Sequence, residues 1–281
     1  MKSLKLHFES LLDDDDIFLG SGNEKKLVKE WINDNYKING NLTITDDLVV
    51  DCSGNVAVRN TSIISLTNGL FRWGRIGRSF YCSHCAITSL EGAPEKVGDN
   101  FNCAYCDNLT SLSGAPKMVM GYFTCDNCVN LTSLEGAPKE IGGNFDCSAC
   151  DNLTSLEGAP EKVGGCFYCN NCKNLKTLEG SPRMVFTSFN CSLCSSLNNL
   201  EGAPEKVGSN FYCHHCEKLT SLEGAPKKID GNFECDNCIN LKTLKGAPEI
   251  VNDLFRCGNC PDLKITDSDR KKYKIFNLTE C

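Results

Sequence analysis

A phrase of 22 residues repeats along most of the chain, and this repeat constrains the fold more than any other feature. Each copy carries a Phe-x-Cys-x-x-Cys segment, and the phenylalanines from Phe101 to Phe255 follow one another at intervals of 22 residues. Phe80 precedes Phe101 by 21 residues. A strict period of this length is typical of a solenoid, in which a short unit stacks on copies of itself. We therefore predict one elongated array rather than several globular domains.

The alternation of side chains along a strand predicts which residues line the inside of each coil. Phe167 and Cys169 are two residues apart and share one face, whereas Tyr168 lies between them and faces the opposite way. Cys172 and Leu175 continue the inward set. Gly and Pro mark the return turn, because Pro excludes helix and Gly accepts backbone angles that other residues resist. The unit is too short for a long helix, so we expect the return segment to be extended or a short 3₁₀ turn.

Two phrases of the repeat resemble a known family. The segment Phe167-x-Cys169-x-x-Cys172 is similar to the Leu-x-Leu-x-x-Asn/Cys strand segment of leucine-rich repeats. Together with Leu-Thr-Ser-Leu-Glu-Gly-Ala-Pro it resembles a cysteine-bearing variety of bacteriophage and gut-bacterial sequences, akin to BspA-like repeats. The resemblance covers residues 79–263. It implies a mainly β, curved, right-handed solenoid of about nine coils that binds partners, and it supplies neither a catalytic residue nor a specific target.

The chain divides into four segments by composition and pattern. These are a flexible acidic tail (1–23), an N-terminal cap (24–78), the repeat solenoid (79–263) and a C-terminal cap (264–281). A solenoid needs caps because its end coils otherwise expose the core.

The two caps have their own expected elements. In the N-terminal cap, apolar residues at helical spacing predict a helix over 24–36, and β-branched runs predict strands near 42–44, 48–50, 56–58 and 63–64. In the C-terminal cap we expect a helix over 266–275, with Thr266 or Asp267 as its N-cap. Ile275, Phe276 and Leu278 would then cover the last coil.

Bulk composition excludes several classes of function. A net charge of −7 disfavours nucleic-acid binding, which depends on a basic excess. No segment approaches the roughly 18 consecutive apolar residues of a membrane span. Residues 1–22 lack the basic start, apolar run and cleavage site of a signal peptide. We expect a cytoplasmic monomer, possible also as a phage-encoded protein in a host cell.

The 21 cysteines allow three readings, and 18 of them belong to the repeat. Buried cysteine is a small apolar side chain, and a recurring cysteine is first a part of the coil. The alternative is a soft-metal site for zinc or Cu(I), in which two neighbouring coils supply four thiolates, such as Cys147, Cys150, Cys169 and Cys172. Disulfides are the third reading, which a reducing compartment disfavours. We expect no cofactor.

The positions that vary between units indicate where a partner would bind. These are the outward strand residue and the two residues inside each cysteine pair, which would form one strip on the strand face. Tyr, Asn and His suit recognition of a protein partner, although a merely solvated face is the alternative. The candidate partner-binding residues are Tyr168, Asn190, Tyr212, His214 and His215. No Ser/His/Asp or Cys/His arrangement lies outside the repeat, so we predict no catalytic residues and no enzyme.

Overall fold

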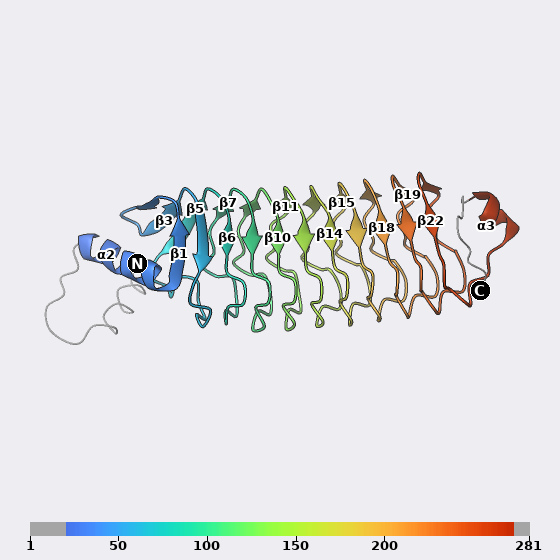
Figure 1. Ribbon diagram of the computed structural model, residues 1–281, viewed down its shortest axis with the longest axis horizontal. Helices are drawn as coiled ribbons and strands as arrows, with labels where there is room; N and C mark the ends of the chain where they lie inside the picture. The colour runs from blue at the N-terminus through green and yellow to red at the C-terminus, as the bar shows by residue number, and fades with distance from the viewer. Residues whose placement is uncertain (1–20, 273–281) are drawn as a thin grey trace.

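The computed structural model describes residues 21–272, and these form a β-solenoid. Coils of about 22 residues lie side by side along one long axis, with the N-terminal helix at one end (Figure 1). The chain is mainly β, as the repeat predicts. We number the coils by their phenylalanines, from coil 1 at Phe80 to coil 9 at Phe255.

Each coil contributes one short strand to each of two eleven-stranded sheets. Sheet A holds the strand that begins with the repeated phenylalanine. Its strands, in spatial order, are β1 Tyr36–Asn39, β4 Asn55–Val58, β6 Phe80–Tyr81, β8 Phe101–Asn102, β10 Phe123–Thr124, β12 Phe145–Asp146, β14 Phe167–Tyr168, β16 Phe189–Asn190, β18 Phe211–Tyr212, β20 Phe233–Glu234 and β22 Phe255–Arg256.

Sheet B is built from the return segment of each coil. Its strands, in spatial order, are β2 Leu42–Ile44, β3 Val49–Cys52, β5 Arg72–Ile76, β7 Lys96–Val97, β9 Met118–Val119, β11 Glu140–Ile141, β13 Lys162–Val163, β15 Met184–Val185, β17 Lys206–Val207, β19 Lys228–Ile229 and β21 Ile250–Val251. The return segment is therefore extended. Its residues pair in register with their repeat equivalents, as Lys162 does with Met184.

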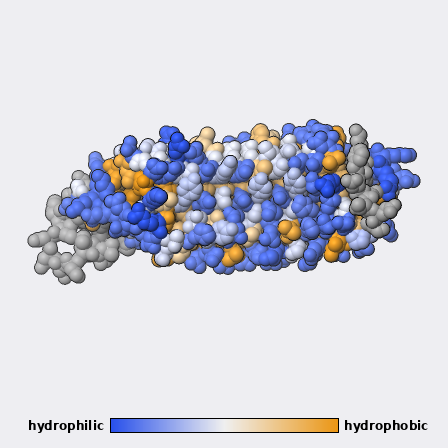
Figure 2. All heavy atoms as spheres, viewed as in Figure 1, coloured by the Kyte–Doolittle hydropathy of each residue, from blue (hydrophilic) through white to orange (hydrophobic). Residues whose placement is uncertain are grey.

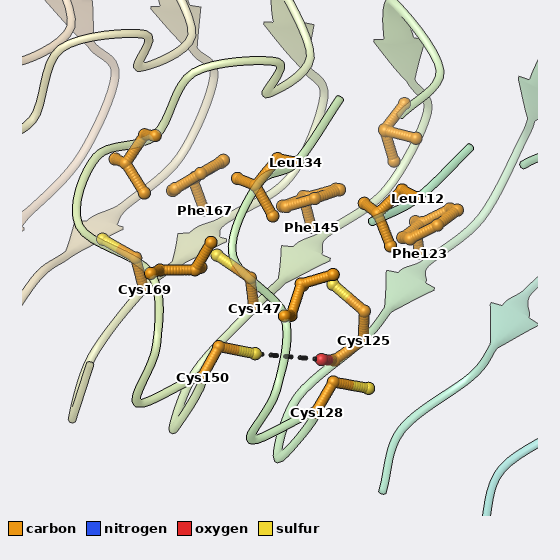
Figure 3. Close-up of a cluster of buried hydrophobic side chains, with 14 of the residues drawn as sticks. Leu112, Phe123, Cys125, Cys128, Leu134, Phe145, Cys147, Cys150, Phe167 and Cys169 are labelled. Carbon is orange, nitrogen blue, oxygen red and sulfur yellow. Dashed lines mark hydrogen bonds between the residues drawn. The ribbon is translucent and has the colours of Figure 1, made fainter. Parts of the chain in front are cut away.

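The inward residues of successive coils form continuous columns in the core. Phe145 stacks on Phe123 and Phe167 with ring centroids 5.4 and 5.2 Å apart, so the predicted phenylalanine stack is confirmed. Figure 3 shows this stack beside a leucine column and two cysteine columns. Cys147 and Cys150 are fully buried there. The interior is thus a set of in-register columns, which is what a strict period requires.

A left-handed residue turns the chain inward after each strand of sheet A. The second residue inside every cysteine pair has φ between 53 and 62°. This conformation rotates the second cysteine into the core. It favours Asn, because a short polar side chain tolerates the left-handed region better than most others. Asn fills the position in four coils, at residues 127, 171, 237 and 259.

The glycine of the return turn is required by the close approach of neighbouring coils. Gly158 has φ 87°, and a Cβ added there would lie 2.3 Å from the backbone nitrogen of Glu135. No other residue type fits this contact. The Glu-Gly-Ala-Pro phrase therefore reflects coil stacking rather than a ligand loop.

The N-terminal cap closes both sheets with antiparallel strands. β1 pairs with β4, and β2 pairs with β3. Helix α2 (Ser21–Asn35) buries Val28 and Ile32 in the hydrophobic core, and Trp31 packs edge-on against Phe71 with ring centroids 5.8 Å apart. The sequence pattern predicted this helix and three of the strands. The predicted strand at 63–64 is wrong, because Ile63 is buried and Ile64 is exposed in a non-strand segment.

At the other end, helix α3 (Asp267–Lys272) begins with a reciprocal cap. The Asp269 backbone N–H donates to Thr266 Oγ1 at 3.2 Å, and the Thr266 N–H donates to Asp269 Oδ2 at 2.9 Å. This is a capping box, so Thr266 is the N-cap. The predicted covering residues Ile275, Phe276 and Leu278 lie outside the described range. Within that range, neither helix combines the length and the apolar character that crossing a bilayer requires.

Candidate functional site

The predicted strand-face strip exists on the outer side of sheet A, except that Ala104 and Ser192, which lie inside cysteine pairs, are buried. We define the sheet A strip as the second residue of each strand from β6 to β22 together with the two residues inside each cysteine pair. Tyr168, Asn190 and Tyr212 are in-register neighbours in coils 5, 6 and 7. Blue and pale colours predominate through the middle of the molecule, and the broadest orange area lies towards the N-terminal end (Figure 2). The strip is thus a polar surface over an apolar core.

Asn and Asp in the outward strand position hold the turn that follows them. Oδ1 of Asn102, Asp146 and Asn190 each accepts the backbone N–H two residues later at 2.9 Å. This Asx turn gives the N–H a partner at the point where the chain leaves the sheet. Asn190, which the sequence indicated as a partner-binding residue, therefore has its side-chain oxygen engaged within its own coil. It lies at the centre of the candidate site as a framework residue.

The two tyrosines occupy the same position without capping a turn. The Tyr212 hydroxyl accepts a hydrogen bond from Asn210 Nδ2 at 2.7 Å. The hydrogen bond between Tyr168 and the Cys166 thiol, together with partial burial, raises the pKa of Tyr168 to about 12. Both rings are half-buried, and both hydroxyls have a fixed partner beside the strand. Their orientations are therefore set before any partner arrives.

The histidines extend the aromatic group of coil 7. The His214 ring lies edge-on to Tyr212 at 6.0 Å between centroids and edge-on to His215 at 5.9 Å. Partial burial lowers the pKa of His214, so the ring is neutral near pH 7. His215 is exposed and has φ 57°, the left-handed conformation common to its position. The structure thus brings Tyr212, His214 and His215 together, as the sequence predicted.

Two stretches of the sheet A strip carry no Asp, Glu, Lys or Arg, coils 1 and 2 and coils 5 to 7. Coils 5 to 7 carry the uncharged tyrosines, histidines and amides. On one side, burial raises the pKa of Asp146, and Asp126 in the preceding coil adds to the effect. On the other side, Arg256 lies 3.8 Å from Glu234 and 3.5 Å from Asp236. Coils 5 to 7 are therefore an uncharged stretch between charged coils on both sides, and in this stretch apolar and hydrogen-bonding contacts are not outweighed by charge.

The four thiols of the alternative metal reading are engaged as hydrogen-bond donors. Cys147 Sγ donates to the Tyr168 carbonyl at 3.3 Å, and Cys169 Sγ donates to the Asn190 carbonyl at 3.4 Å. The Cys150 and Cys172 thiols each donate to the backbone carbonyl of the first cysteine in the preceding coil at 3.3 Å. Burial raises the pKa of all four thiols, which favours the protonated form.

The cysteine geometry therefore fits columns of protonated thiols. Apart from the pair of coil 9, the cysteines in the described range carry free thiols. In the same range no group of three or more His, Cys, Asp or Glu side chains is arranged to hold a metal ion. Figure 3 shows the Cys150 thiol directed at the Cys125 carbonyl oxygen.

Sequence reasoning missed the residue that immediately precedes each phenylalanine. Asn144 Oδ1 accepts the Cys166 N–H, and Asn210 Oδ1 accepts the Asn232 N–H, each at 2.8 Å and each from the next coil. The signal was the recurring Asn before Phe. In coil 5 Cys166 fills this position, and its half-buried thiol accepts a hydrogen bond from Thr187 Oγ1 at 3.0 Å.

Comparison with known proteins identified no relative: no protein-family model, no curated protein and no solved structure matches this chain. The resemblance to cysteine-bearing leucine-rich repeats accordingly stays a prediction.

Proposed function

We propose that the protein is a non-enzymatic binding module whose partner docks across coils 5 to 7 of the sheet A strip. The contact is centred on Tyr168, Asn190 and Tyr212, with His214 and His215 at one side. The partner is a protein, and nucleic acid and membrane are not the targets. The module works in a reducing compartment such as the cytoplasm, as a repeat protein of the cysteine-bearing, leucine-rich-repeat-like type found in phage and bacteria.

One observation carries this proposal. Tyr168 and Tyr212 stand in a column where other coils use Asn or Asp to hold a turn, yet the tyrosines hold no turn. Their hydroxyls are nevertheless fixed by Cys166 and Asn210. Tyr168 and Tyr212 lie two coil spacings apart, with coil 6 between them, so their rings stand roughly 10 Å apart on one face. Rigid, half-exposed tyrosines offer contact area at small entropic cost, which is the property of interface anchors.

The test compares matched tyrosine variants. Tyr168→Ala with Tyr212→Ala removes both anchors, whereas Tyr81→Ala removes a tyrosine from the same column in coil 1. Quantitative affinity capture from the cell that produces the protein should retain a partner on wild type and on Tyr81→Ala. The double variant should weaken that binding by about 2 kcal/mol or more. Circular dichroism should show it folded, and unchanged capture by the folded double variant would contradict the proposal.

A further inference from the structure

A second face of the molecule carries apolar side chains at a regular interval, of which Met118 and Ile250 are exposed and Met184 is half-buried. The outward residue of the sheet B strand is charged in most coils and apolar in coils 3, 6 and 9. In chain order these residues are Arg75, Lys96, Met118, Glu140, Lys162, Met184, Lys206, Lys228 and Ile250. Met118, Met184 and Ile250 are each 66 residues apart, which is three coils.

Neighbouring residues extend each of these positions into a ridge, and we name the three ridges after their coils as ridge 3, ridge 6 and ridge 9. Met120 and Tyr122 follow Met118 at alternate places and are 60% and 52% exposed, while Val119, between Met118 and Met120, is buried. Phe186 follows Met184 and is 56% exposed, and Leu254 follows Ile250. Half of the twelve large apolar side chains exposed in the described range belong to these three ridges. Exposed apolar groups that gather in this way mark an interaction surface.

The coils between ridge 3 and ridge 6 lack a side chain at the place that Met120 and Phe186 occupy, because Gly142 and Gly164 stand there. At the place of Met118 the same two coils carry Glu140 and Lys162, and between ridge 6 and ridge 9 the place of Phe186 is Gly208 and Asp230. A Cβ added to Gly142 would lie 2.0 Å from the Met120 carbonyl oxygen, so coil packing requires glycine there. The result is a trough about two coils wide, and ridges repeat every 14 Å, roughly three strand spacings.

Charge in this trough is already neutralised. Lys162 Nζ lies 2.8 Å from Glu140, and Lys139 Nζ lies 2.9 Å from Glu161. An occupant of the trough therefore needs apolar side chains rather than charges, and it needs them at the spacing of the ridges. A second copy of this chain carries the same three ridges, so its apolar side chains have the required spacing.

We propose that sheet B is a self-association face, on which two copies pack antiparallel with the ridges of each copy in the troughs of the other. A two-fold axis between coils 5 and 6 places ridge 6 of one copy over coils 4 and 5 of its partner. The same axis places ridge 3 over coils 7 and 8. Such an isologous contact is closed and stops at a dimer. This replaces the monomer that the sequence led us to expect.

The size of the face supports a dimer. Nine coils give a length of roughly 43 Å, and a width of about 15 Å gives about 1,300 Å² buried in total, at the lower end of stable interfaces. The strands that carry Met118, Met184 and Ile250 belong to sheet B, whereas the partner-binding tyrosines belong to sheet A. Self-association is therefore independent of the partner-binding function proposed above, and Tyr168→Ala with Tyr212→Ala should leave it unchanged.

Sedimentation velocity on the full chain from about 1 to about 200 µM tests the proposal. Wild type should shift from monomer to dimer, with little effect of salt because the contact is apolar. Met120→Gly with Phe186→Gly introduces the glycine found at residues 98, 142, 164 and 208 of other coils. This variant should weaken association at least tenfold, about 1.4 kcal/mol.

A second variant and a control keep the result interpretable. Met118→Lys with Met184→Lys introduces the lysine found at residues 96, 162, 206 and 228, so it suits the fold even if the glycine variant does not. It should also abolish the dimer. Ile239→Ser removes a side chain that is 48% exposed and lies outside the ridges, and it should associate as wild type does. A wild type that stays monomeric throughout, or folded ridge variants that associate unchanged, would overturn the proposal.

Discussion

At the scale of single residues, the second cysteine of each pair combines two properties that few side chains share. It is small enough for the corner of a coil, and its S–H can donate to a carbonyl that faces the core. In eight coils this thiol donates to the backbone carbonyl of the first cysteine in the preceding coil at 3.1–3.4 Å. A buried carbonyl without a donor costs free energy. The cysteine repeat thus follows from hydrogen bonding as well as from packing.

Cys150 offers a direct measurement of this effect. Cys150→Ala removes the sulfur and leaves the Cys125 carbonyl without its thiol donor, so unfolding free energy should fall by about 2 kcal/mol. Cys150→Val restores most of the volume but no donor, and about 1 kcal/mol of the loss should remain. Urea unfolding measures both variants. Full recovery of stability in the valine variant would show that packing alone selects cysteine here.

Cys166 should behave unlike the paired cysteines. Burial acts to raise the pKa of Cys166, but hydrogen bonds from Thr187, Tyr168 and Ser188 together lower it. A lowered pKa means more thiolate at pH 7, so native Cys166 should alkylate fastest in a Cys281→Ser background, and its rate should level off at a lower pH than that of free cysteine. The buried pairs, whose pKa values burial raises, should react slowly.

The role of Thr187 can be isolated in the same assay. Thr187→Val removes the hydroxyl that donates to Cys166 Sγ at 3.0 Å and keeps the side-chain shape. The pKa of Cys166 should rise, and mass spectrometry should show slower alkylation at pH 7. An unchanged rate would mean that this hydrogen bond does not hold the thiolate.

At the scale of the element, the unit is a two-residue strand followed by a left-handed corner. Such strands gain little from their own length, so each depends on pairing with the coils beside it. The corner is the costly part, because most L-residues lose about 1–2 kcal/mol in the left-handed region. Asn fills it in four coils, whereas Tyr105 and Leu193 do not suit it by conformation. Large side chains at this place therefore lower the stability of the corner that holds them.

Leu193 tests that cost. Its φ is 62° and its side chain is 46% exposed, so Leu193→Asn loses little burial and relieves the backbone. Unfolding free energy should rise by about 0.5–1 kcal/mol. The reverse change, Asn171→Leu at φ 60°, should lower it by a similar amount in thermal unfolding. If both variants unfold with the free energy of the wild type, the left-handed conformation does not cost stability at this place.

At the scale of the whole molecule, the period alone predicted the stack of coils and the inward columns. Phe145, Cys147 and Cys150 lie where the alternation of side chains placed them, because a strict repeat leaves one consistent inside. Sheet B escaped prediction as a sheet, since a two-residue strand is too short to show a period of its own. The sequence did not predict that Asn190 holds a turn. A polar outward residue gives the same sequence pattern whether its side chain binds a partner or its own backbone.

The stack also predicts how damage spreads. Phe145 is fully buried between two rings, so Phe145→Ala should cost about 3–5 kcal/mol. Each coil contacts its neighbours alone, so the loss should be local rather than global. Hydrogen exchange should show that coils 3 to 5 lose protection first, while the amides of coils 7 and 8 keep wild-type protection.

Phe211→Ala is the matched control, because it should move the unprotected region by three coils towards the C-terminus. Uniform loss of protection along the chain would show that the solenoid unfolds as a single cooperative unit, and a cost below about 1 kcal/mol would show that the ring does not support the core.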